Sequence, residues 1–163
     1  MRWIVVFAAA GLLAGCATTR PAGLSSQSLV STWRCGPTAM HGPTFDMAVS
    51  TETINRADGR YTSLTTSVIT PHGKSPVVIQ DRASGTWLLE GDILVSRIEG
   101  VKFLSSSDSS ISNERGQKMQ DDLLKKKSIY RSRILKFTRR TLRIIPVEPT
   151  DKEAEVESLC KRI

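Results

Sequence analysis

The side chains in this sequence that could carry chemistry are few: two histidines and three cysteines. His41 and His72 both lie in turns that contain glycine and proline. A metal site needs further ligands at defined spacing, and none appears in the sequence. The chain also has no Gly-x-Ser-x-Gly elbow and no phosphate-cradling loop. We therefore expect no catalytic residue, no metal site and no cofactor, and interpret both histidines as solvated loop residues.

The first cysteine, Cys16, follows a segment typical of an export signal. Arg2 gives the positive start, residues 3–13 form an apolar run, and Ala14 and Gly15 are the small residues of a cleavage site. The apolar run is too short for a bilayer core, which takes about 20 residues. We therefore predict a cleaved signal at residues 1–15. An ordinary signal peptide that happens to contain a cysteine is the alternative.

The tetrad Leu13-Ala14-Gly15-Cys16 resembles the lipobox of bacterial lipoproteins, in which a diacylglyceryl group is attached through the cysteine sulfur. The resemblance implies that Cys16 is the lipid-bearing N-terminus of the mature protein. Each buried methylene of its acyl chains contributes about 0.8 kcal/mol to anchoring. In such lipoproteins an Asp after the cysteine favours the inner membrane, so Ala17 implies the outer membrane, with the domain facing the periplasm.

Cys35 and Cys160 are the two cysteines that remain once Cys16 is lipidated. They stand near the two ends of the folded part, in a compartment where disulfides persist. We predict that they pair and tie the last segment to the first strand. Two free thiols are the alternative.

Length and charge bound the rest of the chain. The 163 residues leave one domain after the signal, and the net charge of +7 falls by one when Arg2 is removed. A basic balance favours acidic partners such as anionic lipid or an acidic protein, and it equally keeps a protein soluble. Export makes nucleic acid an improbable partner.

The elements expected along the chain are mostly strands. Small and polar residues predict a flexible lipidated tether at 16–31, which leaves 32–163 for the domain. Val, Ile and Thr runs between turn signals predict strands near Trp33 and at Met47–Asn55, Tyr61–Thr70, Val77–Asp81, Thr86–Leu89, Ile93–Leu104, Ile129–Phe137 and Leu142–Val147. A short helix is expected at Glu114–Lys127, before the last two strands. Gly100 suggests a bulge in its strand.

About eight consecutive short strands predict an all-β, antiparallel up-and-down meander that closes into a barrel or half-barrel. This layout resembles lipocalin-like domains, including small ones on bacterial lipoproteins. Lipocalins carry Gly-x-Trp on the first strand, where this chain has Ser31-Thr32-Trp33. They also stack an Arg of the last strand over that Trp. The resemblance implies that Arg143 closes the barrel over Trp33, with Arg140 as the alternative.

Apolar residues of the strands are expected to line the barrel interior, either as an ordinary core or around a pocket for a hydrophobic ligand. They are Met47, Val49, Leu64, Val68, Trp87, Leu89 and Leu94. Many Thr and Ser residues surround Leu64, which weakens the case for a dry, fully packed interior.

A basic cluster marks the last third of the chain. Its candidate site residues are Arg131, Arg133, Lys136, Arg139 and Arg140. Strand alternation places Arg131 and Arg133 on one face and Lys136 on the other, unless a bulge shifts the register. One interpretation is a patch for anionic lipid or an acidic protein; the other is a solvated surface balanced by neighbouring acids.

Two classes of function fit these features. One is a non-catalytic, membrane-anchored binder of a small apolar or amphipathic ligand. The other is a periplasmic interaction module, either an envelope-complex subunit or an inhibitor or immunity protein. A cavity of several hundred cubic ångströms would favour the binder, whereas a filled barrel with an exposed apolar patch would favour the module.

Overall fold

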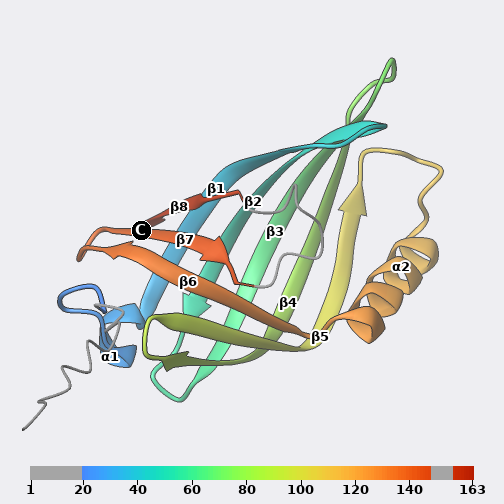
Figure 1. Ribbon diagram of the computed structural model, residues 1–163. Coiled ribbons are helices and arrows are strands. Elements are labelled where there is room, and N and C mark those ends of the chain that lie inside the picture. The colour runs from blue at the N-terminus through green and yellow to red at the C-terminus, as the bar shows by residue number, and fades with distance from the viewer. Residues whose placement is uncertain (1–19, 148–155) are drawn as a thin grey trace, which may run out of the picture.

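The structure, a computed structural model, describes residues 20–147 and 156–163, which form eight strands and two helices (Figure 1). The predicted signal peptide and Cys16 lie outside these residues. The strands are β1 (Ser31–His41), β2 (Phe45–Asn55), β3 (Arg60–Pro71), β4 (Val77–Glu90), β5 (Ile93–Ser106), β6 (Ile129–Phe137), β7 (Thr141–Pro146) and β8 (Ser158–Arg162). The helices are α1 (Ser26–Leu29) and α2 (Asn113–Lys126).

The strands form a closed antiparallel barrel in which each pairs with the next along the chain and β8 returns to β1. This confirms the predicted all-β meander with a short helix. The strand assignment differs in two places. The segments predicted as Val77–Asp81 and Thr86–Leu89 are one strand, β4, and the eighth strand is β8 at the C-terminus. Three strands, not two, therefore follow α2.

Strand β4 continues through residues 83–85 because a β-bulge accommodates them. Ser84 lies opposite Gly100 and Gly85 lies opposite Ile98, so Glu99 is the extra residue on β5. A Cβ on Gly85 would lie 1.9 Å from the Arg97 carbonyl oxygen, a distance that no side chain tolerates. The bulge expected from Gly100 is therefore present, and the glycine of the partner strand makes room for it.

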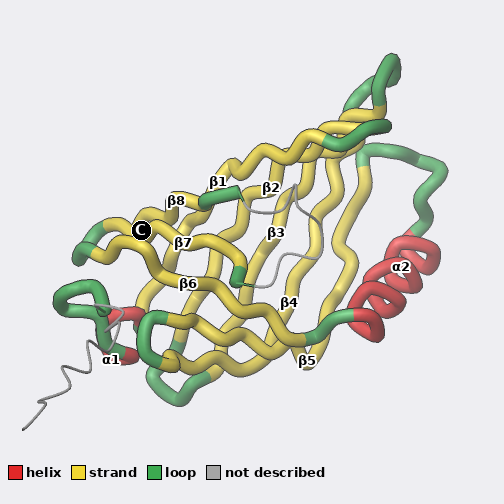
Figure 2. Tube along the Cα trace, in the orientation of Figure 1, coloured by secondary structure: helices red, strands yellow, loops and turns green. Residues whose placement is uncertain are grey.

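The helices lie at different places on the barrel (Figure 2). Helix α1 sits at one end, where Ser25 and Ser28 form a capping box and Leu29 is fully buried. Leu24, also buried, joins the same cluster. The prediction of a flexible tether over 16–31 is therefore wrong from Leu24 onward. Leu24 and Leu29 bury their side chains in the apolar cluster at the end of the barrel, and this burial favours an ordered segment.

Helix α2 covers an open edge of β5. Strand β6 pairs with β5 only between Ile93 and Arg97, which leaves the rest of that edge without a strand partner. The Gln117 side chain takes the place of one: its amide oxygen accepts from the Phe103 N–H at 2.9 Å, and its nitrogen donates to the Val101 carbonyl at 2.9 Å. Gly116 lets the helix approach, because a Cβ there would lie 2.6 Å from the Phe103 ring. The helix thereby protects a sheet edge that could pair with another chain.

Candidate ligand-binding cavity

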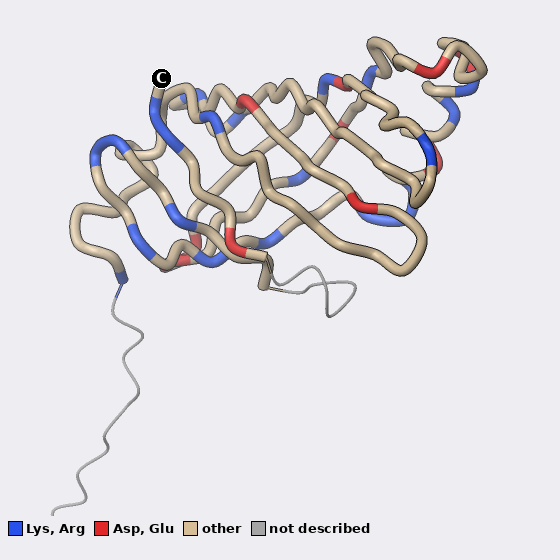
Figure 3. The backbone as a smooth tube through the Cα atoms, turned by 90° about the horizontal axis from the view of Figure 1, so that it is seen from above, with Lys and Arg blue, Asp and Glu red and all other residues tan. Residues whose placement is uncertain are grey.

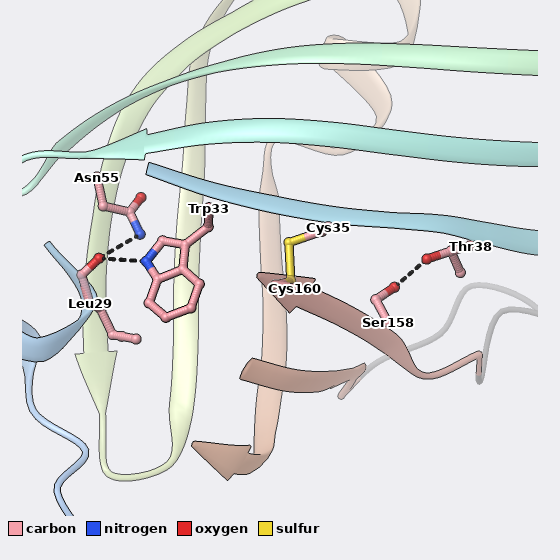
Figure 4. The surroundings of a disulfide bond; sticks show 7 residues. All are labelled: Leu29, Trp33, Cys35, Thr38, Asn55, Ser158 and Cys160. Atoms are coloured by element: carbon pink, nitrogen blue, oxygen red, sulfur yellow. Dashed lines mark hydrogen bonds between the residues drawn. A yellow bond between two sulfur atoms is a disulfide. The ribbon is translucent and has the colours of Figure 1, made fainter. Parts of the chain in front are cut away.

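The barrel is plugged at the α1 end by a buried apolar cluster. Leu24, Leu29, Trp33, Tyr61, Trp87, Ile134, Leu142 and Cys160 form it. The Trp33 indole donates from Nε1 to the Leu29 carbonyl at 3.0 Å, and the Asn55 side-chain amide donates to the same oxygen at 3.4 Å (Figure 4). The indole N–H and the Asn55 amide thus share one carbonyl acceptor, and Trp33 is only 2% exposed. The plug is an ordered floor, not a loose end of the barrel.

A cavity of about 510 Å³ lies above this floor, between β1–β2 on one side and β5–β8 on the other. Its lining comprises Trp33, Cys35, Thr38, Met40, Val49, Thr51, Thr53, Asn55, Tyr61, Leu94, Ser96, Ile98, Tyr130, Ser132, Leu142, Ile144, Pro146, Val156, Ser158 and Cys160. Four of these residues, Trp33, Tyr61, Leu142 and Cys160, also belong to the plug. The volume falls within the range of small-molecule sites.

The seam between β1 and β8 forms one wall of the cavity. Its backbone register is short, from Trp33 opposite Arg162 to Cys35 opposite Cys160. A disulfide joins the two cysteines, which confirms the predicted pairing (Figure 4). Beyond it, the Thr38 and Ser158 hydroxyls lie 2.6 Å apart and continue the contact. Covalent and hydrogen bonds therefore hold the wall together where the strand pairing is brief.

Most of the polar side chains that line the cavity carry a hydroxyl group. Four of these hydroxyls form no hydrogen bond with any described residue and are therefore available to a ligand. They belong to Thr51, Thr53, Ser96 and Ser132. Burial, followed by the charges of Tyr130 and Glu99, raises the pKa of Tyr61 to about 12. Its phenol therefore stays neutral at physiological pH and can donate a hydrogen bond.

Among the described residues, no charged side chain lines the cavity. A ligand with a buried charge would find no counter-ion there, and burying an unpaired charge costs much more than burying a hydroxyl. The lining consequently favours an apolar body with neutral polar groups, or an amphipathic molecule whose charged end stays in water.

The structure brings only part of the predicted interior set to the cavity. Val49 and Leu94 line it. Met47 lies opposite Met40, a lining residue, and so extends the same face beyond the cavity. Trp87 is buried in the plug, and Leu89 packs against it.

Two predicted interior residues are on the outer wall instead. Leu64 lies between Glu52 and Arg82 in neighbouring strands, and Val68 lies between Ala48 and Val78. Directly opposite residues share a face, so both side chains point away from the barrel interior. Their placement inside was wrong because strand β3 presents Ser and Thr to the interior and keeps these apolar residues outside.

A carboxyl group lies on the inner face next to the cavity. Asp81 is opposite Thr65, and Thr65 is opposite Thr51, which lines the cavity. Burial raises the pKa of Asp81 from 3.8 to about 6, because the charged form loses solvation.

This shift predicts a pH dependence of stability. The unfolded chain releases the Asp81 proton near pH 4, whereas the folded protein keeps it to about pH 6. The free energy of unfolding should therefore fall as pH rises through this window. Asp81→Asn should remove that slope and be more stable at pH 7 by about 1–2 kcal/mol, a value reduced for partial solvation. Urea unfolding at pH 4 to 7 measures both effects; a variant with the wild-type slope would contradict them.

The arginine over Trp33 is Arg162. Its guanidinium carbon lies 4.8 Å from the ring centroid, and Nη2 donates to the Ser28 carbonyl. Arg143 instead pairs with Glu157 on the outer face, and Arg140 lies in the exposed β6–β7 turn. The choice of Arg143 or Arg140 was wrong because the last barrel strand is β8, not β7.

Some members of the basic cluster have acidic partners among the described residues and others do not. Arg131 lies 3.8 Å from Glu90, and Arg133 lies 3.4 Å from Asp92. A register shift between Ile134 and Lys136 places Lys136 opposite Arg143, on the outer face with the arginines. The alternation-based placement of Lys136 on the other face is therefore corrected by a bulge. Arg139 and Arg140 lie exposed in the turn between β6 and β7.

The two histidines meet at one carboxylate. Asp46 Oδ1 is 2.9 Å from His41 Nδ1 and 3.9 Å from His72 Nε2. Within residues 20–147 and 156–163, no three His, Cys, Asp or Glu side chains come together as a metal site. Neither described helix is long and apolar enough to cross a membrane.

In comparisons with known proteins, no protein-family model and no curated protein matches this chain.

Proposed function

We propose that the protein is a non-catalytic bacterial envelope lipoprotein, anchored through Cys16, that holds a small apolar or amphipathic ligand in its barrel. The cavity of about 510 Å³, with hydroxyls and no charge in its described lining, carries the proposal. A packed core of this size would leave no such space. The lipobox-like tetrad supports the anchor, and the Trp33–Arg162 pair supports the lipocalin-like interpretation of the barrel.

The ligand class follows from the shape of the apolar surface. Met40 and Val49 line the cavity, and Met47 continues the same face outward. An elongated molecule could place its apolar part against these residues and its hydrogen-bonding groups near Thr51 and Thr53. We therefore propose a lipid-like ligand with an uncharged inner portion.

A cavity-filling variant tests the binding site. The uncharged fluorescent probe N-phenyl-1-naphthylamine should bind the wild type and gain fluorescence, and Thr51→Phe should weaken binding by at least about tenfold. The control is Thr62→Phe: Thr62 lies opposite Ile54 and Ser84 on the outer face, so the same change there should leave binding intact.

Native mass spectrometry of the detergent-extracted protein provides the second measurement. A lipid that co-purifies with the wild type but not with Thr51→Phe supports the proposal. Probe binding that is equal in Thr51→Phe and Thr62→Phe would reject the cavity as the site.

One observation favours the interaction module as a second candidate. Met119 and Leu123, which lie one turn apart on α2, are 42% and 56% exposed. Exposed apolar side chains on one face of a helix can mark a protein-binding surface. A protein that co-purifies with the wild type and is lost in Met119→Gln/Leu123→Gln would favour this candidate.

A further inference from the structure

We propose that the plugged end of the barrel rests on the membrane, where Arg139 and Arg140 contact anionic lipid headgroups and the cavity lies on the side away from the bilayer. This inference rests on the proposed anchor at Cys16 and adds to it an orientation and a lipid-contacting surface.

The position of the chain start limits the orientation. Arg20 is the first described residue, and the chain is fixed shortly afterwards, where the Leu24 N–H bonds the Pro21 carbonyl and Leu24 enters the plug. Four residue steps separate Cys16 from Arg20, and an extended chain covers about 14 Å in four steps. A lipid on Cys16 would therefore hold the plugged end close to the headgroups.

The β6–β7 turn lies beside this chain start. Arg139 shares a groove with Ala22, Gly23 and Ser28 of the N-terminal segment, and with Arg162 of β8. Figure 1 shows the same proximity between α1 and the tip of the β6–β7 hairpin. The segment that leads to the anchor and the turn that carries two arginines thus face the same side of the molecule.

The two arginines of this turn differ in ion pairing from three other arginines of β6 and β7. Arg131, Arg133 and Arg143 each have an acidic partner. Arg139 and Arg140 are exposed and make no ion pair with any described residue. Figure 3 shows several Lys and Arg positions around the barrel end where the described part of the chain starts. Phosphate headgroups are the complementary partner, because basic residues near an anionic surface gain attraction that weakens within a Debye length.

Hydrogen–deuterium exchange on the lipidated full chain tests the orientation. The protein is placed on vesicles of phosphatidylcholine alone or mixed with phosphatidylglycerol. We expect the amides of residues 138–141 to exchange about fivefold more slowly on the anionic vesicles, and less so at high salt. The turn at residues 72–76, at the other end of the strands, should exchange equally on both.

Charge variants assign the effect to the two arginines. Arg139→Gln/Arg140→Gln should abolish the slowing. The matched control is Arg82→Gln/Lys102→Gln, a directly opposite pair of exposed basic residues on β4 and β5 that should keep it.

The outcomes separate this inference from the proposal beneath it. An intact mass without acyl groups on Cys16 overturns the anchor. An acylated protein whose 138–141 amides exchange equally on both vesicles overturns the orientation alone. Slowing that persists in Arg139→Gln/Arg140→Gln also overturns it, since other residues would then make the contact.

Discussion

Trp33→Ala should lower the free energy of unfolding by about 3–5 kcal/mol, the range for truncating a large buried aromatic side chain. The ring is 2% exposed and forms the floor of the cavity. It packs against Phe137 with ring centroids 6.5 Å apart, under the Arg162 guanidinium. Its removal would leave a void between α1 and the barrel and take away the aromatic face on which Arg162 rests. Urea denaturation followed by circular dichroism measures the change.

The control for this prediction is Trp33→Phe. Phenylalanine keeps an aromatic face for Arg162 but loses the Nε1 hydrogen bond to the Leu29 carbonyl. That oxygen still accepts from the Asn55 amide, so the loss should be about 1 kcal/mol plus a smaller packing term. Equal stabilities of Trp33→Ala and Trp33→Phe would show that the ring is not what holds the plug together.

The periodic strands were predictable from sequence, and the exceptions have local causes. Val-, Ile- and Thr-rich runs between turns mark β2, β3 and β5 well. The sequence predicts two strands in place of β4, because Gly85 is typical of a turn. In the structure Gly85 lies within the strand, where it makes room for the bulge of β5. Strand β8 is Ser-Leu-Cys-Lys-Arg, which is too short and polar to show a strand pattern. Its pairing with β1 was visible only through the cysteines.

The cavity was harder to predict than the barrel. The interpretation of interior positions relied on apolar residues, whereas the interior of β2 is Val49, Thr51, Thr53 and Asn55. A period of two between polar residues is ordinarily the mark of an outer face. The Thr- and Ser-rich composition was the available signal, and it indicated an interior that is not dry. Assigning each residue to a face required the register between strands.

The arginines show why a resemblance carried over by position can fail. The stacking arrangement predicted for Trp33 is present, but β8 supplies its cation through Arg162. Arg143, one strand earlier, has the right residue type and points outward to Glu157. Leu142 and Ile144, on either side of it, face the interior. Because side chains alternate along a strand, Arg143 must face outward.

Two separate features close the barrel: the plug beneath the cavity and the disulfide in the cavity wall. Cys35→Ala/Cys160→Ala tests the second and should lower the free energy of unfolding by about 2–5 kcal/mol. The bridged residues are 125 apart in sequence, so the bridge closes a long loop in the unfolded chain. It also joins strands whose register covers little more than Trp33 to Cys35.

Loss of the bridge should affect the cavity as well as global stability, because both cysteines line it. We expect faster amide exchange in β8 and weaker probe binding even under conditions where the variant remains folded. Thr38→Val is the matched control: it removes the Thr38–Ser158 hydrogen bond from the same seam and should cost only about 1 kcal/mol. If the double cysteine variant lost no more stability than Thr38→Val, the backbone pairing and the plug alone would be sufficient to close the barrel.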